Sequence, residues 1–174
     1  MILYKQAPIG DIDEKAGIVK GYGSVFGNRD SDDDVIMRGA YSKTIQENGD
    51  RVKYIYQHDI TKPIGKMTEL GEDDKGLYFT AEIPDTQLGR DVMKLIKGGV
   101  ITENSVGIMP VVKNYNEEEK TRYIKEVKLY EISAVTIAAN DQAKINDVKG
   151  HDIYLQNIEK KFDALQKLLE NENI

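Results

Sequence analysis

The residues of this chain that are best suited to chemistry are its five serines and two histidines. A serine hydroxyl becomes a nucleophile when a neutral histidine lies within hydrogen-bond reach and a third group fixes the tautomer of that histidine. His151 stands at the start of a terminal helical segment, where a histidine is normally a surface residue. His58 ends an alternating, aromatic stretch and is the candidate base, although an isolated histidine there is more often structural.

Two of the serines, Ser105 and Ser133, lie in stretches with strand character. Ser105 opens a predicted strand, and the backbone amides of Val106 and Gly107 are candidates for holding an oxyanion. Because glycine has no side chain, Gly107 would also let a substrate or a neighbouring backbone approach closely. Ser133 lies in mid-strand on the same face as Glu131, since strand side chains repeat with a period of two, so either can hydrogen-bond the other.

Composition narrows the class of protein. The 174 residues, 40% of them hydrophobic and 31% charged, suffice for one domain of ordinary size plus an appended segment. A net charge of -6 gives no electrostatic reason to expect a nucleic acid or an anionic membrane as a partner. The absence of cysteine excludes disulfides, thiolate zinc sites and a cysteine nucleophile. With no apolar run near the roughly 20 residues of a membrane span and no signal peptide, we expect a soluble, cytoplasmically made protein.

An acidic loop over residues 30–34 is the one place with the spacing of a metal site. Asp30, Asp32 and Asp34 match the first three ligands of a calcium loop. The match then fails, because Val35 stands where the turn glycine belongs and Tyr41 where the bidentate glutamate belongs. We interpret the segment as a solvated acidic turn and expect no metal and no cofactor.

Hydrophobic periodicity predicts a mainly-β body with two short helices. The predicted strands are residues 17–26, 52–57, 63–70, 77–84, 105–115, 121–129 and 131–138. One helix is expected over residues 40–48, and a second from an N-cap at residues 85–86 to Gly98–Gly99. The many hairpin signals favour an α+β fold, mainly β, in which an antiparallel sheet closes or wraps into a barrel with short flanking helices.

The segment 151–174 differs in kind from residues 1–150. Its apolar residues are spaced as an amphipathic stripe, formed by Leu155, Ile158, Phe162, Leu165 and Leu169. Such a helix either packs its stripe on the barrel or forms a seam with a helix of another chain, and two heptads are short for an autonomous coiled coil. We therefore divide the chain into a body over residues 1–150 and a C-terminal amphipathic helix over residues 151–174.

Several short segments occur in a characteristic order along the chain. They are GYGSVFGN (21–28), DSDDDVI (30–36), YQHD (56–59), KPIG (62–65), DTQLGR (85–90), NSVG (104–107) and LYEISAVT (129–136) leading to AN (139–140). In this order they resemble the prohead (procapsid maturation) serine proteases of tailed bacteriophages. The resemblance runs from about residue 17 to about residue 148, and it implies a fold similar to that of the herpesvirus assembly protease.

The resemblance also assigns roles to residues. The catalytic histidine of the family matches His58, and its nucleophilic serine matches Ser105. The herpesvirus enzyme uses a second histidine as its third member, and this chain has none at the matching place. Glu131 is the candidate instead. Asp59 is the rival, but neighbouring strand residues point to opposite faces, so Asp59 should point away from the partner of His58.

The function that this resemblance implies is a serine endopeptidase of procapsid maturation. Its partners would be the major capsid protein precursor, the scaffolding segment and the protease itself, through autocleavage or a homo-oligomer formed by the C-terminal helix. It would be made in the host cytoplasm and packaged inside the procapsid. One alternative is a catalytically inactive scaffolding module with the same fold. Another is an esterase or acyl transferase, which would need a concave apolar pocket rather than a groove for an extended peptide.

Overall fold

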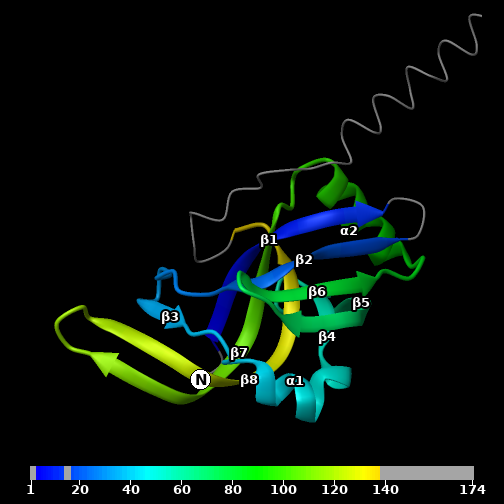
Figure 1. Cartoon of the computed structure of the whole chain (residues 1–174). Helices are drawn as coiled ribbons and strands as arrows, with labels where there is room; N and C mark the ends of the chain where they lie inside the picture. The colour runs from blue at the N-terminus through cyan, green and yellow to red at the C-terminus, as the bar shows by residue number, and fades with distance from the viewer. Residues whose placement is uncertain (1–2, 14–16, 138–174) are drawn as a thin grey trace, which may run out of the picture.

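The computed structural model describes the backbone of residues 3–13 and all atoms of residues 17–137 (Figure 1). The strands are β1 (Leu3–Asp13), β2 (Ile18–Val25), β3 (Asp34–Ile36), β4 (Lys53–Tyr56), β5 (Asp59–Glu72), β6 (Gly76–Glu82), β7 (Glu103–Asn116) and β8 (Thr121–Val135). The helices are α1 (Ser42–Asn48), α2 (Gln87–Lys97) and the short 3-10 helix η1 (Gly49–Arg51). His151 and the predicted C-terminal helix lie outside the described residues.

The strands form one sheet that curls back on itself. Its order is β3-β8-β4-β5-β6-β2-β1-β7, and β8, the second strand of this order, also pairs with the last strand, β7, so that the sheet curls back on itself. The prediction of a mainly-β body with two short helices and a wrapped sheet is thus confirmed. Within the described residues, no helix combines the length and the apolar character needed to cross a bilayer.

The prediction of a purely antiparallel sheet was wrong at β8. Both β3 and β4 pair with β8 in parallel, Asp34 with Arg122 at one end and Lys53 with Glu131 at the other. An antiparallel direction is imposed when a tight turn joins two strands. Strands β4 and β8 are instead joined through three other strands and α2, so local turn signals carry no information about their direction.

Strand β8 is continuous, whereas the sequence predicted two strands with a break near Tyr130. The β7–β8 pairing has three irregularities of register, at which one residue is left out of the pairing: Tyr130 and Lys125 on β8, and Val111 on β7. Pro110 cannot donate a ladder hydrogen bond and lies at one of them, as is usual for a proline within a strand. Beyond this point β7 and β8 extend as a hairpin away from the body (Figure 1).

The helices close the body at opposite ends of the sheet (Figure 1). Helix α2 begins where predicted, because the Thr86 hydroxyl accepts a hydrogen bond from the Gly89 amide at 3.0 Å. Its inner face buries Val92 and Ile96. Helix α1 ends before Gly49, as predicted, and continues into η1.

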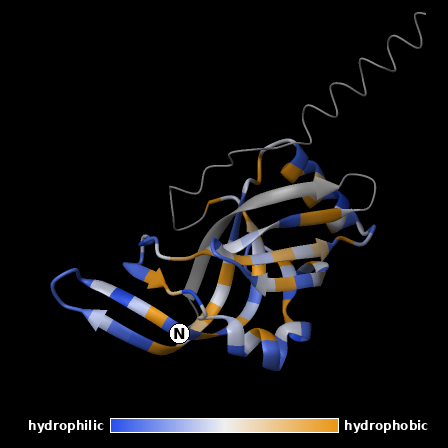
Figure 2. Cartoon of the chain, in the orientation of Figure 1, coloured by the Kyte–Doolittle hydropathy of each residue, from blue (hydrophilic) through white to orange (hydrophobic). Residues whose placement is uncertain are grey.

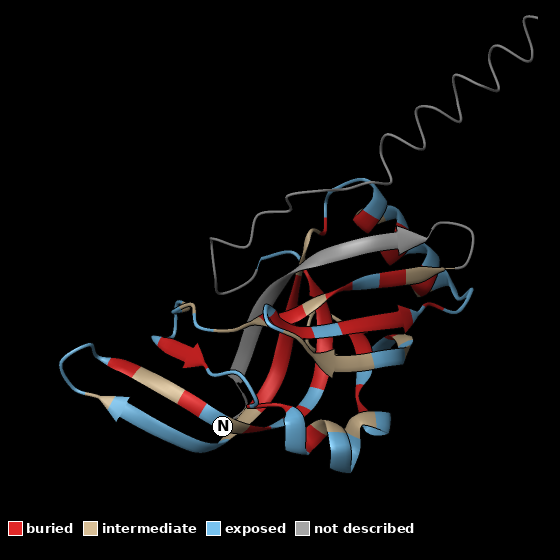
Figure 3. Cartoon of the chain, viewed as in Figure 1, coloured by how far each residue is buried: buried red, intermediate tan, exposed pale blue. Residues whose placement is uncertain are grey.

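The core lies inside the curl, where apolar residues alternate with polar ones along the strands (Figure 2) and buried segments gather in the body (Figure 3). Tyr54 of β4 and Phe79 of β6 pack with ring centroids 5.1 Å apart. Val106 of β7 and Ile132 of β8 are fully buried in the same cluster. Because side chains alternate along a strand, the residues on either side of Val106 and Ile132 belong to the opposite face of the sheet.

Candidate active site

His58 lies in the turn between β4 and β5, directly after the strand that the sequence predicted it to end or lie on. Gln57 and His58 have φ angles of 55° and 56°, and Tyr56 pairs with Asp59 across them. Two consecutive positive φ angles are the requirement of a two-residue type I′ hairpin turn, and they are uncommon for residues other than glycine. The Gln57 amide bonds to the Ala134 carbonyl at 3.0 Å, which ties the turn to β8.

Glu131 of β8 contacts the His58 ring. Its Oε1 lies 2.7 Å from Nδ1 of His58, and the two side chains are 8% and 20% exposed. An ionised carboxylate can only accept a hydrogen bond, so Nδ1 carries the proton and the lone pair of a neutral His58 is on Nε2. Partial burial strengthens the contact, because little water competes for it.

Ser133 contacts both members of this pair. Its hydroxyl donates to Oε2 of Glu131 at 2.6 Å and accepts from the backbone amide of His58 at 3.1 Å. The side chain is fully buried. The predicted hydrogen bond between Ser133 and Glu131 on one face of the strand is therefore present.

Ser105 lies on β7 directly opposite Ser133 of β8. Residues opposite each other in an antiparallel pair project to the same face, with Cβ atoms roughly 4.5–5.5 Å apart. Ser105 is 2% exposed. It thus shares a face of the sheet with Ser133 and Glu131, the two residues that hold His58.

The neighbouring residue, Asn104, anchors β7 from the core side. Its side-chain oxygen accepts a hydrogen bond from the Tyr54 hydroxyl at 2.8 Å, and its side-chain nitrogen donates to the Tyr22 carbonyl at 3.2 Å. Asn104 is fully buried, and burial raises the pKa of the Tyr54 hydroxyl. Sequence reasoning missed Asn104 as a structural partner of the site, although its place beside Ser105 in the NSVG segment was a signal.

The missing side chain of Gly107 makes room for Glu131. The two residues are opposite partners across β7 and β8. A β-carbon at position 107 would lie 3.0 Å from Cδ of Glu131 and closer still to Oε1. The Glu131 carboxylate therefore occupies the space that a side chain at position 107 would fill.

The Val106 and Gly107 amides, the predicted oxyanion donors, lie where β7 is paired on both edges, with β1 and with β8. Backbone amides of a paired strand point along the sheet toward the neighbouring strands. Their oxyanion role stays a prediction.

Asp59, the first residue of β5, contacts residues of its own strand. Its Oδ1 accepts from the amide and the hydroxyl of Thr61 at 2.9 and 2.6 Å, and its Oδ2 lies 3.0 Å from Nζ of Lys62. These contacts, the Thr61 hydroxyl first, lower the pKa of Asp59 to about 2. Asp59 was expected to point away from the partner of His58, and these contacts at the start of β5 hold it instead to Thr61 and Lys62.

The acidic loop is held by its own backbone and by two arginines, since Arg29 pairs with Asp33 at 2.6 Å. Oδ1 of Asp30 accepts from the amides of Asp32 and Asp34 at 2.9 and 3.0 Å. The buried Asp34 carboxylate pairs with the Arg122 guanidinium through two contacts of 2.6 Å. Across residues 17–137, no group of three or more potential ligand side chains is placed to hold a metal ion.

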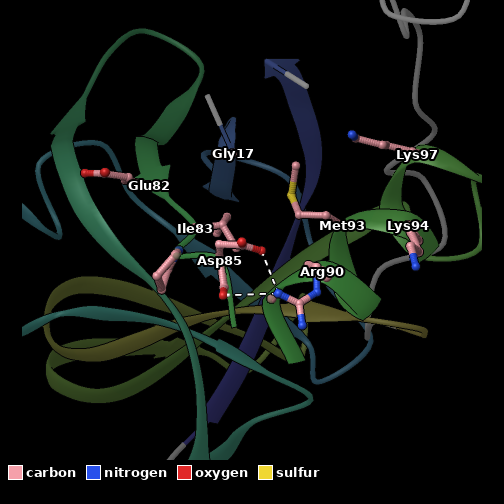
Figure 4. Close-up of a pocket in the computed structure, with 10 residues that line it drawn as sticks. Gly17, Glu82, Ile83, Asp85, Arg90, Met93, Lys94 and Lys97 are labelled. Carbon is pink, nitrogen blue, oxygen red and sulfur yellow. Dashed lines mark hydrogen bonds and ion pairs between the residues drawn. The ribbon is translucent and has the colours of Figure 1, made fainter. Parts of the chain in front are cut away.

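A hollow of about 550 Å³ lies elsewhere, beside α2 (Figure 4). Arg90, Lys94 and Lys97 of the helix line it, and Arg90 pairs with Asp85 at 2.8 Å. His58, Ser105 and Glu131 are not among its lining residues. This hollow is therefore separate from the candidate active site.

Comparison with known proteins places this geometry in a family. A family model described as Caudovirus prohead serine protease matches residues 6–158, which include His58, Ser105 and Glu131. The chain belongs to this family. A prohead protease of Enterobacteria phage HK97 is 35% identical over 143 residues, and one of Escherichia phage T5 is 32% identical over 150 residues.

The matches cover most of this chain but less of the relatives. They take in 80% and 82% of the chain, and 64% and 70% of the HK97 and T5 prohead proteases. A capsid polyprotein of Pseudomonas phage PAJU2 is 24% identical over 86% of this chain, which corresponds to 22% of the polyprotein. The bacteriophage T4 capsid assembly protease, gp21, superposes with a TM-score of 0.61 at 14% identity, covering 78% of this chain and 96% of that structure. That likeness shows a shared fold.

Proposed function

We propose that this chain is a serine endopeptidase that cleaves capsid and scaffold precursor proteins, and itself, during procapsid maturation. Ser105 is the nucleophile, His58 the general base and Glu131 the group that orients His58. The observation that carries the proposal is the 2.7 Å contact between Nδ1 of His58 and Oε1 of Glu131, on the face of the sheet that bears Ser105. Membership of the prohead protease family supports the same reaction.

The reaction follows from these roles. Nε2 of His58 takes the proton of Ser105 as Oγ bonds to the scissile carbonyl carbon, and Glu131 stabilises the imidazolium that forms. His58 then gives this proton to the departing amine as the peptide C–N bond breaks, which leaves an ester on Ser105. A water molecule, deprotonated by His58, attacks the ester, and the proton returns to Ser105 as the acid leaves.

The substrate follows from the relatives. Two of them are named prohead proteases, one a capsid assembly protease, and the PAJU2 match lies within a capsid polyprotein. We assign capsid and scaffold precursors as substrates, bound in extended form, and the interior of the procapsid as the place of action, after synthesis in the host cytoplasm. Confinement with the precursor raises its effective concentration, so a slow enzyme suffices. Residues 151–174 would tether the body, residues 1–150, to capsid or scaffold, or join two copies.

An inactive scaffolding module is not favoured. Glu131 is 6% exposed, and burying a carboxylate is unfavourable unless its oxygens are hydrogen-bonded. His58 and Ser133 supply those hydrogen bonds. A module without catalysis would have no need for this arrangement.

The test is intact-mass analysis after co-expression with the cognate capsid protein precursor. The wild-type chain, Ser105→Ala and the control Ser31→Ala, which alters an exposed turn serine, are compared. We expect a shortened precursor with the wild type and Ser31→Ala, and none with Ser105→Ala. Equal cleavage with Ser105→Ala would remove Ser105 as nucleophile. An uncleaved precursor in all samples, despite assembled shells, would favour the scaffolding module.

A further inference from the structure

The geometry points to Ser133 as a positioning residue: one buried hydroxyl holds both the backbone of His58 and the carboxylate of Glu131, and so presents the imidazole to Ser105 in one orientation. This inference rests on the proposed function, because it assigns how the base of that reaction is held. Ser133 itself is not a nucleophile in this arrangement.

The hydroxyl is engaged on both sides. A serine hydroxyl has one proton and two lone pairs. The proton goes to Oε2 of Glu131 at 2.6 Å, and a lone pair receives the His58 amide at 3.1 Å. With no exposed surface at Ser133, water is not at hand to replace either contact. The bond to Oε2 leaves Oε1 directed at Nδ1 of His58, since the two oxygens of one carboxylate move together.

The turn that carries His58 has a backbone conformation that must be stabilised by contacts such as the hydrogen bond to Ser133. His58 has a φ of 56°, a conformation that a residue with a side chain adopts only when its surroundings impose it. Strand β8 and Thr136, which follows it, attach to the turn through hydrogen bonds. The Ala134 carbonyl accepts from the Gln57 amide, Thr136 bonds to the Gln57 side chain, and Ser133 accepts from the His58 amide. Of these, the bond from Ser133 acts on His58 itself.

Ser133 also lies between the proposed base, His58, which it contacts, and the proposed nucleophile, Ser105, which it faces across the strands. It is the cross-strand partner of Ser105 in the β7–β8 ladder. The residue that holds His58 is thus the β8 residue directly opposite Ser105. Removing the hydroxyl would leave a buried amide and one carboxylate oxygen without these partners, and the imidazole would then sample orientations away from Ser105.

The test uses two readouts on the full chain. One is the low-field ¹H NMR resonance of the His58 Nδ1 proton in ¹⁵N-histidine-labelled protein, assigned by its loss in His58→Ala. The other is the rate at which a fluorophosphonate probe modifies Ser105, followed by intact mass. The variants are Ser133→Ala and the conservative Ser133→Thr. Ser24→Ala, which removes another buried serine hydroxyl, on β2, is the matched control.

We expect Ser133→Ala to shift or broaden the Nδ1 resonance and to slow modification of Ser105 by about 100-fold, the effect of a small misplacement of a catalytic group. Ser133→Thr should restore both readouts. Ser24→Ala should leave both unchanged even where its melting temperature falls as much as that of Ser133→Ala. A Ser133→Ala protein with the wild-type resonance and the wild-type rate would overturn the inference.

The two proposals fail in distinguishable ways. Should the wild type show the resonance, and Ser133→Ala disturb it, while the probe never modifies Ser105, the positioning role stands and the proposed nucleophile is wrong. Should the probe modify Ser105 at the same rate in wild type and in Ser133→Ala, the nucleophile stands and the positioning role is wrong.

Discussion

Gly107 lies directly opposite Glu131 across β7 and β8, and the Glu131 carboxylate occupies the space that a side chain at position 107 would take. The serine-x-glycine spacing beside Ser105 therefore has a structural reason that is independent of substrate. A larger residue at position 107 would push the carboxylate away from the ring of His58.

We expect Gly107→Ala to slow fluorophosphonate modification of Ser105 by about 100-fold, because Glu131 is displaced from Nδ1 of His58. The matched control is Gly49→Ala, where an added β-carbon would meet its nearest neighbour at 3.7 Å, an ordinary contact. The rate at which the probe labels Ser105 in each variant is measured from intact-mass time courses. A Gly107→Ala protein as reactive as Gly49→Ala would show that Glu131 need not lie at Gly107.

Glu131→Gln tests the orienting role of the carboxylate. Glutamine has nearly the same shape but can present an N–H to the ring, which favours the wrong tautomer of His58. We expect cleavage of the capsid precursor to fall by about 10³- to 10⁴-fold without disappearing, because Ser105 and His58 remain. Glu126→Gln, on the same strand and paired with Lys43 at 2.9 Å, is the control that should stay active. Full activity of Glu131→Gln would assign the third role to another group.

Asn104→Leu should lower the free energy of unfolding by about 1–3 kcal/mol, because the buried Tyr54 hydroxyl loses its acceptor. Urea unfolding measures the change. In the Asn104→Leu background, the further substitution Tyr54→Phe should be less destabilising than in the wild type, since the orphaned hydroxyl is then removed. Equal effects of Tyr54→Phe in both backgrounds would contradict the coupling.

The Asp59 carboxyl, at the start of β5 and beside His58, should become protonated only at low pH. Its pKa is lowered from 3.8 to about 2, so its contribution to stability is complete above pH 3.8 and is lost as the pH falls through about 2. Titration of the Asp59 carboxyl carbon by ¹³C NMR should give a midpoint near 2. Thr61→Ala removes the hydroxyl that contributes most and should raise the midpoint toward 3.8. An unchanged midpoint in Thr61→Ala would assign the shift to other contacts.

Much of the body could be predicted from periodicity and local signals. Alternation located most strands, and the Thr86 cap and Gly49 located helix ends, because these depend on residues within one or two turns of each other. The wrong predictions concern strand bounds that depend on pairing with strands far away in the sequence. The continuous β8 and the start of β5 at Asp59 depend on partners that accommodate bulges, which no local pattern records.

For the site, the residue types and their faces were determined by the sequence alone. Glu131 and Ser133 share a face because a strand has a period of two, and the order of short segments singled out His58 and Ser105. Only the tertiary structure decided that Glu131 meets His58, 73 residues away, and that Gly107 makes room for it. A strand pattern specifies which way a side chain points, but not which strand lies beside it. That choice belongs to the packing of the whole sheet, where β4 pairs in parallel with β8 and the His58 turn is held at a positive φ.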